Sequence, residues 1–234
     1  MTNTFAVQDP GTWGPSLDAA VATIARGDLV VLPTDTVYGV GADPFDPRAV
    51  ARLLAAKGRG RQMPPPVLVA NESGLDALAD QVPDFVRALV AAFWPGGLTV
   101  ICSVQPSLAW DLGETRGTVA LRMPNHPAAL ALLTRTGPLA VSSANLTGHP
   151  AALTCADAQS QLGDSIGCYL DGGSAPGQIA STIVDATGGS ARVVRLGAID
   201  VAALEAVIGS VELAPGVPAN SSSPANPSHG PEAR

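Results

Sequence analysis

The chain has 234 residues, of which 46% are hydrophobic, 14% charged and only 4% aromatic, and its formal net charge is −7. This composition supports one well-buried aliphatic domain, or at most two small ones, and excludes a wholly disordered chain. Twenty acidic against thirteen basic residues disfavour a general nucleic-acid binder, which presents a basic face to the phosphate backbone.

Helix and strand patterns alternate along the chain. Ser16 is expected to cap the first helix and Gly27 to end it, while Asp46 and Pro47 match the N-cap and N1 positions of the second. The expected helices cover residues 17–26, 47–56, 75–79, 84–93, 126–135 and 201–208. The expected strands cover residues 28–32, 67–70, 98–104, 118–123, 139–142, 168–171, 182–185 and 193–196.

Continuous apolar strands that alternate with helices indicate an α/β fold, in which helices cover both faces of the sheet. Successive strand signals near residues 98 and 118, and again near 182 and 193, predict some antiparallel pairs within a mixed, twisted sheet. We expect a single domain over residues 1–213. Residues 214–234 are rich in Pro, Ser and Asn without periodicity, and are predicted to form a disordered tail.

The sequence carries no sign of a membrane protein or of a disulfide-built one. No apolar run approaches the roughly 20 residues that a membrane helix needs, and residues 1–14 show no signal-peptide pattern. Three cysteines without a CxxC spacing predict neither a disulfide framework nor a zinc site; they are Cys102, Cys155 and Cys168. We therefore expect a cytoplasmic protein with reduced thiols.

Polar side chains stand at the ends of five predicted apolar strands. They are Thr34 to Thr36, Arg122, Ser142 to Asn145, Ser181 and Arg195. In open α/β sheets, ligands bind where several strand ends converge. For any single hydroxyl, capping a turn or a helix is the more ordinary role. Five such ends together, three with a cation alongside, favour a pocket for an anionic ligand.

The segment Lys57-Gly58-Arg59-Gly60-Arg61 follows the end of a predicted helix, where cations interact favourably with the helix dipole. The two glycines would also let the backbone approach a ligand, and three close cations suit a phosphate. The chain has twelve arginines and only this one lysine, which either marks a site for a compact ammonium or reflects chance. The motifs GxxxxGK[ST] and HExxH are absent, no GxGxxG follows a strand, and no GxSxG forms a strand-to-helix elbow, so an ATP site here would be of another type.

Six segments in order resemble the threonylcarbamoyl-AMP synthase family, which has a YrdC-like domain. They are PTDTVYGVG (33–41), KGRGRQMPPPVLVA (57–70), LRMPNHP (121–127), SSANLTGHP (142–150), STIVD (181–185) and VVRLGAI (193–199). The resemblance covers roughly residues 15–210. It implies the single-domain form of the family, without the additional C-terminal domain of longer members.

The resemblance implies a nucleotidyltransferase that makes threonylcarbamoyl-AMP and pyrophosphate from L-threonine, bicarbonate and ATP. Mg²⁺ would be held mainly by the nucleotide rather than by a protein metal site. Downstream tRNA threonylcarbamoyl-transfer machinery would then modify an adenosine in tRNA. The positions matching the family's L-threonine site are Thr36, Arg122, Ser143 and Ser181. Those matching its ATP site are Lys57, Arg59, Thr118, Asn145 and Arg195, of which Lys57 and Arg59 are expected to be catalytic.

The chain departs from the family pattern at three positions. Met63 stands where many relatives have a Lys or Asn that touches ATP, and Leu68 stands where some have a His that contacts threonine. Leu153 occupies a family hydroxyl position, with Thr154 one place beyond. Arg61 is a candidate replacement for the missing cation. These departures bear on the contacts to ATP and threonine rather than on the family.

Two alternatives come from other functional classes. A carbamoyltransferase with a YrdC-like domain would share the adenylating pocket, although such domains usually belong to much longer chains. A protein that binds double-stranded RNA or tRNA, even weakly, would use the same concave basic surface. The net charge of −7 argues against the broad basic patch that the second alternative needs.

Overall fold

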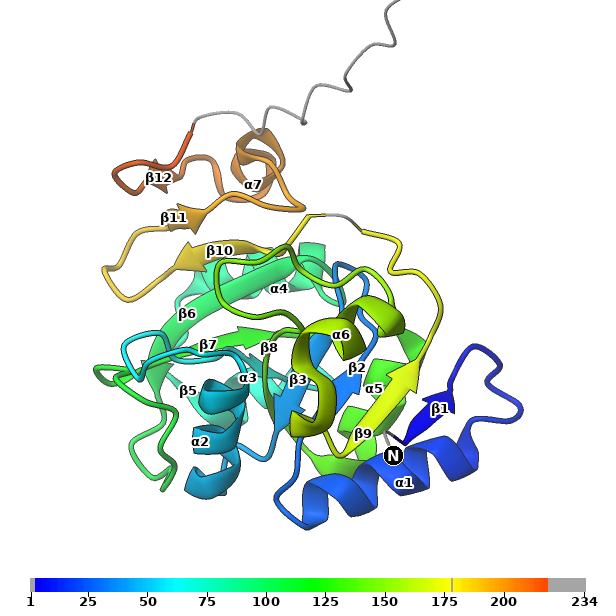
Figure 1. Cartoon of the computed structure of the whole chain (residues 1–234). Coiled ribbons are helices and arrows are strands. Elements are labelled where there is room, and N and C mark those ends of the chain that lie inside the picture. The colour runs from blue at the N-terminus through cyan, green and yellow to red at the C-terminus, as the bar shows by residue number, and fades with distance from the viewer. Residues whose placement is uncertain (1–2, 178, 219–234) are drawn as a thin grey trace, which may run out of the picture.

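The computed structural model describes residues 3–177 and 179–218. Within these residues twelve strands form one mixed sheet, in the order β1-β9-β2-β3-β8-β4-β7-β6-β10-β11-β12, with β5 paired to β6 (Figure 1). The strands are β1 (Thr4–Ala6), β2 (Val30–Leu32), β3 (Gly39–Ala42), β4 (Val67–Leu68), β5 (Ala79–Asp80), β6 (Leu98–Val104), β7 (Thr118–Arg122), β8 (Leu139–Ser143), β9 (Cys168–Asp171), β10 (Thr182–Asp185), β11 (Arg192–Arg195) and β12 (Glu212–Leu213).

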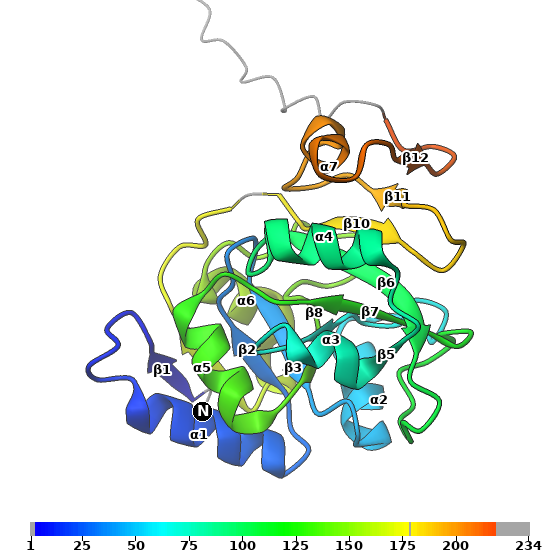
Figure 2. The same cartoon turned by 180° about the vertical axis from the view of Figure 1, so that it is seen from behind.

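Helices flank this sheet, as the predicted α/β class requires (Figure 2). They are α1 (Gly14–Ala25), α2 (Pro47–Ala56), α3 (Ser73–Leu78), α4 (Asp84–Phe93), α5 (Pro127–Thr136), α6 (Cys155–Leu162) and α7 (Val201–Ile208), with a 3-10 turn at Gly163–Ser165. In the described part of the chain, none of them is long and apolar enough to cross a membrane.

Strand β2 shows why the sheet is covered on both faces. Its side chains alternate between two apolar clusters: Val30 and Leu32 belong to the cluster that includes α1 and α5, whereas Val31 belongs to the larger cluster on the other face. Successive side chains of a strand point to opposite faces of the sheet, so a strand that is apolar at every position exposes neither face to water. The continuous apolar run around Val31 is therefore explained by two-sided burial.

The strand pairing brings distant polar residues to the same region. The predicted antiparallel pairs β6–β7 and β10–β11 are confirmed. Parallel β4 and β7 place Leu68 opposite Arg122, and antiparallel β3 and β8 place Gly39 opposite Ser143. A Cβ atom on Gly39 would lie 2.6 Å from Cγ1 of Val141, so a larger residue could not occupy this position without a shift.

Helix boundaries agree with the sequence at α2 and differ at α1. The Asp46 side chain accepts a hydrogen bond from Arg48 N at 2.9 Å, which confirms the predicted cap before Pro47. Ser16 is not a cap: α1 already begins at Gly14, and the Ser16 hydroxyl donates to Ala6 O at 2.8 Å. The prediction was wrong because this hydroxyl serves a contact to β1 that lies outside its own helix.

Several elements were not predicted from the sequence, namely β1, β3, β5, β12 and α6. Strand β3 has the sequence GVGA, and two glycines weaken the strand pattern. Helix α6 begins with a capping box in which Thr154 and Asp157 exchange hydrogen bonds, a signal that was readable in the sequence.

The predicted boundary at residue 213 coincides with the end of β12, but the chain remains in contact beyond it. Ala214 N donates to Val193 O at 2.9 Å, and Val217 packs against the core. The rest of the predicted tail, residues 219–234, lies outside the described residues, so its disorder stays a prediction.

Two truncations separate these parts of the C-terminus. Removing residues 219–234 should leave the melting temperature unchanged, because their sequence offers little apolar surface for burial. Removing residues 214–234 also deletes the Ala214 hydrogen bond and the Val217 packing, and should lower the melting temperature by about 3 °C. Calorimetry of both truncated chains tests this, and a large loss from the shorter deletion would contradict it.

Candidate functional site

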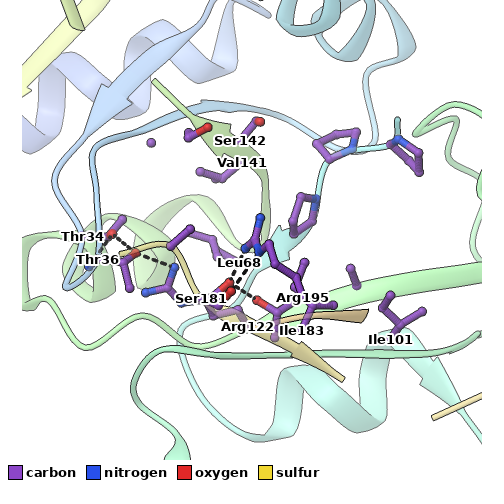
Figure 3. Close-up of a pocket in the computed structure, with 18 of the residues that line it drawn as sticks. Thr34, Thr36, Leu68, Ile101, Arg122, Val141, Ser142, Ser181, Ile183 and Arg195 are labelled. Carbon is purple, nitrogen blue, oxygen red and sulfur yellow. Dashed lines mark hydrogen bonds between the residues drawn. The ribbon is translucent and has the colours of Figure 1, made fainter. Parts of the chain in front are cut away.

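A cavity of about 280 Å³ is lined by residues of β3, β4, β6, β7, β8 and β10 and by Arg195 at the end of β11 (Figure 3). Its wall includes polar residues from all five strand ends that the sequence singled out: Thr34, Thr36, Arg122, Ser142, Ser143, Ser181 and Arg195. The predicted convergence is therefore observed. Arg59 and Thr118 complete the set of predicted site residues that reach the wall.

Arg122 is held rigidly at one end of the cavity. Its residue is only 7% exposed, and its Nη2 donates to Asp35 Oδ1 at 2.6 Å. Nη1 donates to Thr36 Oγ1 at 2.9 Å, and Nε donates to Gly96 O at 2.9 Å. A guanidinium has five N–H groups, so two remain available to a ligand such as a carboxylate.

Ser181 and Arg195 form the adjoining wall because β10 and β11 are antiparallel. Arg195 Nε donates to Ser181 O at 3.0 Å, and Nη2 donates to Ser181 Oγ at 2.9 Å. The Ser181 hydroxyl also lies 2.8 Å from Thr99 Oγ1 on β6. The start of one strand and the end of the next thus fix one guanidinium and one hydroxyl side by side.

Arg59 reaches the cavity from the loop after α2. Its Nη1 donates to Ser142 Oγ at 3.1 Å, whereas its buried Nε has no hydrogen-bond partner among the described residues. An unsatisfied buried donor is costly, and a ligand oxygen would relieve that cost.

The three guanidinium groups of Arg59, Arg122 and Arg195 make this end of the cavity strongly positive. Burial lowers the pKa of Arg195, and so do the charges of Arg122 and Arg59, which indicates that Arg195 is close enough to be repelled by both. Of these three arginines, only Arg122 pairs with a carboxylate of the described residues, that of Asp35. An anion bound between these groups would offset the repulsion.

Much of the remaining wall is apolar. It includes Leu68, Ile101, Leu112, Val119, Ile183 and the prolines 64 to 66. In Figure 3, Ile101 lies on the opposite side of the arginines from Thr34 and Thr36. The cavity thus suits a ligand that combines anionic groups with a flat or apolar part.

Two predicted residues lie outside the wall. Lys57 is 2% exposed, and its Nζ donates to Asn145 O at 2.6 Å and also to Ser143 O. The Asn145 side chain donates to Leu146 O and to His149 O, both at 2.8 Å. Lys57 therefore contacts the loop after β8, and Asn145 is part of that loop. The expected contact of both residues with a nucleotide stays a prediction.

The positions that depart from the family pattern fall into two groups. Leu68, where the family pattern led us to expect a His in some members, lines the cavity with an apolar side chain. Met63 is 41% exposed and lies outside the wall. Arg61 is also outside the wall and pairs with Asp111 at 2.7 Å, so the structure gives no support for its replacing a missing phosphate contact.

Thr34 and Asp35 were placed at a strand end from the sequence but given no role, and Thr99 was not predicted at all. Asp35 stands inside the PTDTVYGVG segment, and its carboxylate also accepts a hydrogen bond from Asn125 N at 2.9 Å. Thr34 Oγ1 lies 3.1 Å from Thr36 Oγ1. The signal for Asp35 was its place between two hydroxyl residues, but its partner Arg122 is 87 positions away.

Comparison with known proteins places the chain in one family. Residues 22–197 match the family model Sua5_yciO_yrdC, which is described as telomere recombination. A Mycobacterium tuberculosis protein, provisionally named a threonylcarbamoyl-AMP synthase, is 51% identical over 209 residues, which are 89% of this chain and 96% of that protein. The threonylcarbamoyl-AMP synthase of Bacillus subtilis is 35% identical over 91% of this chain and 62% of its own length.

A solved structure has the same fold. The crystal structure of Pyrococcus abyssi Sua5 complexed with L-threonine superimposes with a TM-score of 0.85 at 31% sequence identity. The match covers 92% of this chain and 63% of that one.

The Asp35–Arg122 pair provides a test of how the cavity is held. Their side chains are 15% and 9% exposed, so Asp35→Ala leaves an uncompensated buried charge and should cost about 3–5 kcal/mol of unfolding free energy. As a control, Asp76→Ala breaks an ion pair whose side chains are 51% and 58% exposed and should leave the urea midpoint nearly unchanged. Equal effects of the two substitutions would contradict this account.

Proposed function

Because the chain belongs to the Sua5, YciO and YrdC family, we propose that it is a threonylcarbamoyl-AMP synthase, an enzyme that acts on ATP and L-threonine. The cavity with its three guanidinium groups is the observation that supports this best. Its positive end suits carboxylate and phosphate groups, and its apolar wall suits a purine. The names of the relatives support the same activity.

We assign the L-threonine site to the end of the cavity at Arg122. Two free N–H groups of its guanidinium would bind the threonine carboxylate as a planar fork. The hydroxyl groups of Thr36, Ser143 and Ser181 line the same cavity and would bind the amine and hydroxyl of the amino acid. The Asp35 carboxylate keeps Arg122 in place for this contact.

Arg59 and Arg195 are assigned to the phosphates of ATP, and Thr118 to the nucleoside. Arg59 carries an unpartnered buried Nε, and Arg195 lies close enough to both other arginines to feel their charge. Preorganised cations stabilise the charge that develops during transfer without having to rearrange. On this assignment the enzyme is a nucleotidyltransferase.

The reaction forms one C–N bond and then exchanges one P–O bond. The neutral amine nitrogen of threonine attacks the carbon of CO₂, which derives from bicarbonate, and loses a proton to give a carbamate. A carbamate oxygen then attacks the α-phosphorus of ATP, and the bond to the β-phosphate oxygen breaks. Pyrophosphate leaves with that electron pair, and threonylcarbamoyl-AMP remains. The protein contributes positioning and charge neutralisation.

Mg²⁺ is proposed to enter with ATP. In residues 3–177 and 179–218 there is no group of three or more His, Cys, Asp or Glu that could hold a metal ion. The cavity wall offers hydroxyls and guanidiniums, which are poor partners for Mg²⁺. The donor set therefore does not form a protein-built magnesium site, and phosphate oxygens would supply the ligands.

The product is a reactive mixed anhydride, so we propose that cytoplasmic tRNA threonylcarbamoyl-transfer machinery consumes it. The three cysteines are free and buried, in keeping with a reducing compartment.

The proposed function is tested by incubating the purified chain with ATP, L-threonine and bicarbonate. Mass spectrometry should detect threonylcarbamoyl-AMP and pyrophosphate in equal amounts. Omission of threonine or of bicarbonate should abolish both products. Pyrophosphate release without threonine would instead indicate a different nucleotide hydrolase or transferase.

Arg122→Lys tests whether the Arg122 end of the cavity binds threonine rather than ATP. Lysine keeps the charge but cannot make the planar two-bond contact to a carboxylate, so the KM for threonine should rise about tenfold or more. The KM for ATP should change by less than about threefold. Steady-state kinetics, with each substrate varied in turn, measures both KM values. A loss confined to ATP would mean that Arg122 serves the phosphates.

A further inference from the structure

Lys57 follows directly on helix α2, and its ammonium group is enclosed by the loop that follows β8. The residue is only 2% exposed. Its Nζ donates to the backbone oxygens of Ser143 and Asn145, the second at 2.6 Å, and has a longer contact of 3.5 Å to Asn145 Oδ1. An ammonium has three N–H groups, and three loop oxygens surround this one.

The main chain of Lys57 holds the same loop from its other side. Thr147 N donates to Lys57 O at 2.9 Å. Asn145 closes the loop on itself through Leu146 O and His149 O. Lys57 therefore contacts both the start and the middle of the segment 143–149, which Tyr38 O and Gln161 Oε1 also hold through the amides of Ala144 and Leu146.

The held loop carries part of the cavity wall. Ser142 and Ser143 line the cavity, whereas Lys57 and Asn145 do not. The Ser142 hydroxyl accepts a hydrogen bond from Arg59 Nη1, and Arg59 is two residues beyond Lys57. The segment after α2 thus holds two consecutive serines, one through its hydroxyl and the next through its carbonyl oxygen.

We propose that Lys57 is a positioning residue, which sets the place of Ser142 and Ser143 in the cavity through the loop 143–149 and does not contact the substrates. This rests on the proposed function and differs from the role that the family resemblance implies, a contact to the ATP phosphates. The lone lysine of the chain is explained by three converging oxygens, which a compact ammonium satisfies better than a planar guanidinium.

The charge state agrees with this role. Burial lowers the pKa of Lys57 to about 8, with a further contribution from the charge of Arg59. Hydrogen bonds to three oxygens favour the ammonium form, because a neutral amine would turn its lone pair toward one of them.

A positioning role and a contact to the ATP phosphates predict different results most clearly when no nucleotide is present. In Lys57→Met the charge is lost while the length and apolar stem are kept. If Lys57 positions the loop, the affinity for L-threonine alone, measured by calorimetry, should fall about tenfold or more, as for the loss of charged hydrogen bonds. Hydrogen exchange at the amides of 143–149 should accelerate by a similar factor. A phosphate contact would leave both unchanged and weaken only ATP binding.

The matched control is Leu53→Val, a buried substitution one turn earlier on α2 that should lower the melting temperature without changing threonine affinity. A double-mutant cycle adds Asn145→Ala. Because both residues act through one loop, the double variant should bind threonine about as weakly as Lys57→Met alone, whereas independent contacts would multiply their effects.

The outcomes are distinct. Unchanged threonine affinity together with unchanged hydrogen exchange in Lys57→Met would overturn the positioning role. A parent chain that binds no threonine would instead count against the proposed function, and the exchange measurement would still test the role of Lys57 in the loop. Lys57→Arg should restore the affinity only in part, since its planar group cannot reach all three oxygens.

Discussion

The site depends on keeping three guanidinium groups charged within one largely buried cavity. Like charges at close range repel, and burial removes the water that would otherwise screen them. The protein offsets this with polar partners for each cation: a carboxylate and a hydroxyl for Arg122, a backbone carbonyl and a hydroxyl for Arg195, and a hydroxyl for Arg59. The remaining positive potential is what an anionic substrate would neutralise, so binding energy and site stability are linked.

The sheet supplies these partners because its strands run in both directions. Because β10 and β11 are antiparallel, the start of β10 lies beside the end of β11, so Ser181 and Arg195 meet in one wall of the cavity, which two parallel neighbours would not permit. Close backbone contacts complete the arrangement. A Cβ atom on Gly197 would lie 2.1 Å from Ala180 O, so this glycine lets the chain after β11 pass directly beside the segment that leads to Ser181.

The sequence predicted the fold class and much of the cavity wall, because both follow from local patterns. Buried strands show as continuous apolar runs, and hydroxyl or basic residues at their ends are visible without knowing the pairing. The placement of Asp35 and of Lys57 depended on partners more than 80 positions away, which no local pattern reveals. The same limit explains Ser16, whose hydroxyl serves a contact to another element rather than its own helix.

The cavity draws on both ends of the folded chain, since its wall runs from Thr34 to Arg195. Strand β2, near the start, pairs with β9, and β6 pairs with β10 only after residues 105–181 between them have been added. During synthesis on the ribosome, a nascent chain therefore cannot form the complete anion pocket until Arg195 has emerged. Substrate binding can stabilise only the finished protein, so the early segments must avoid aggregation without that help.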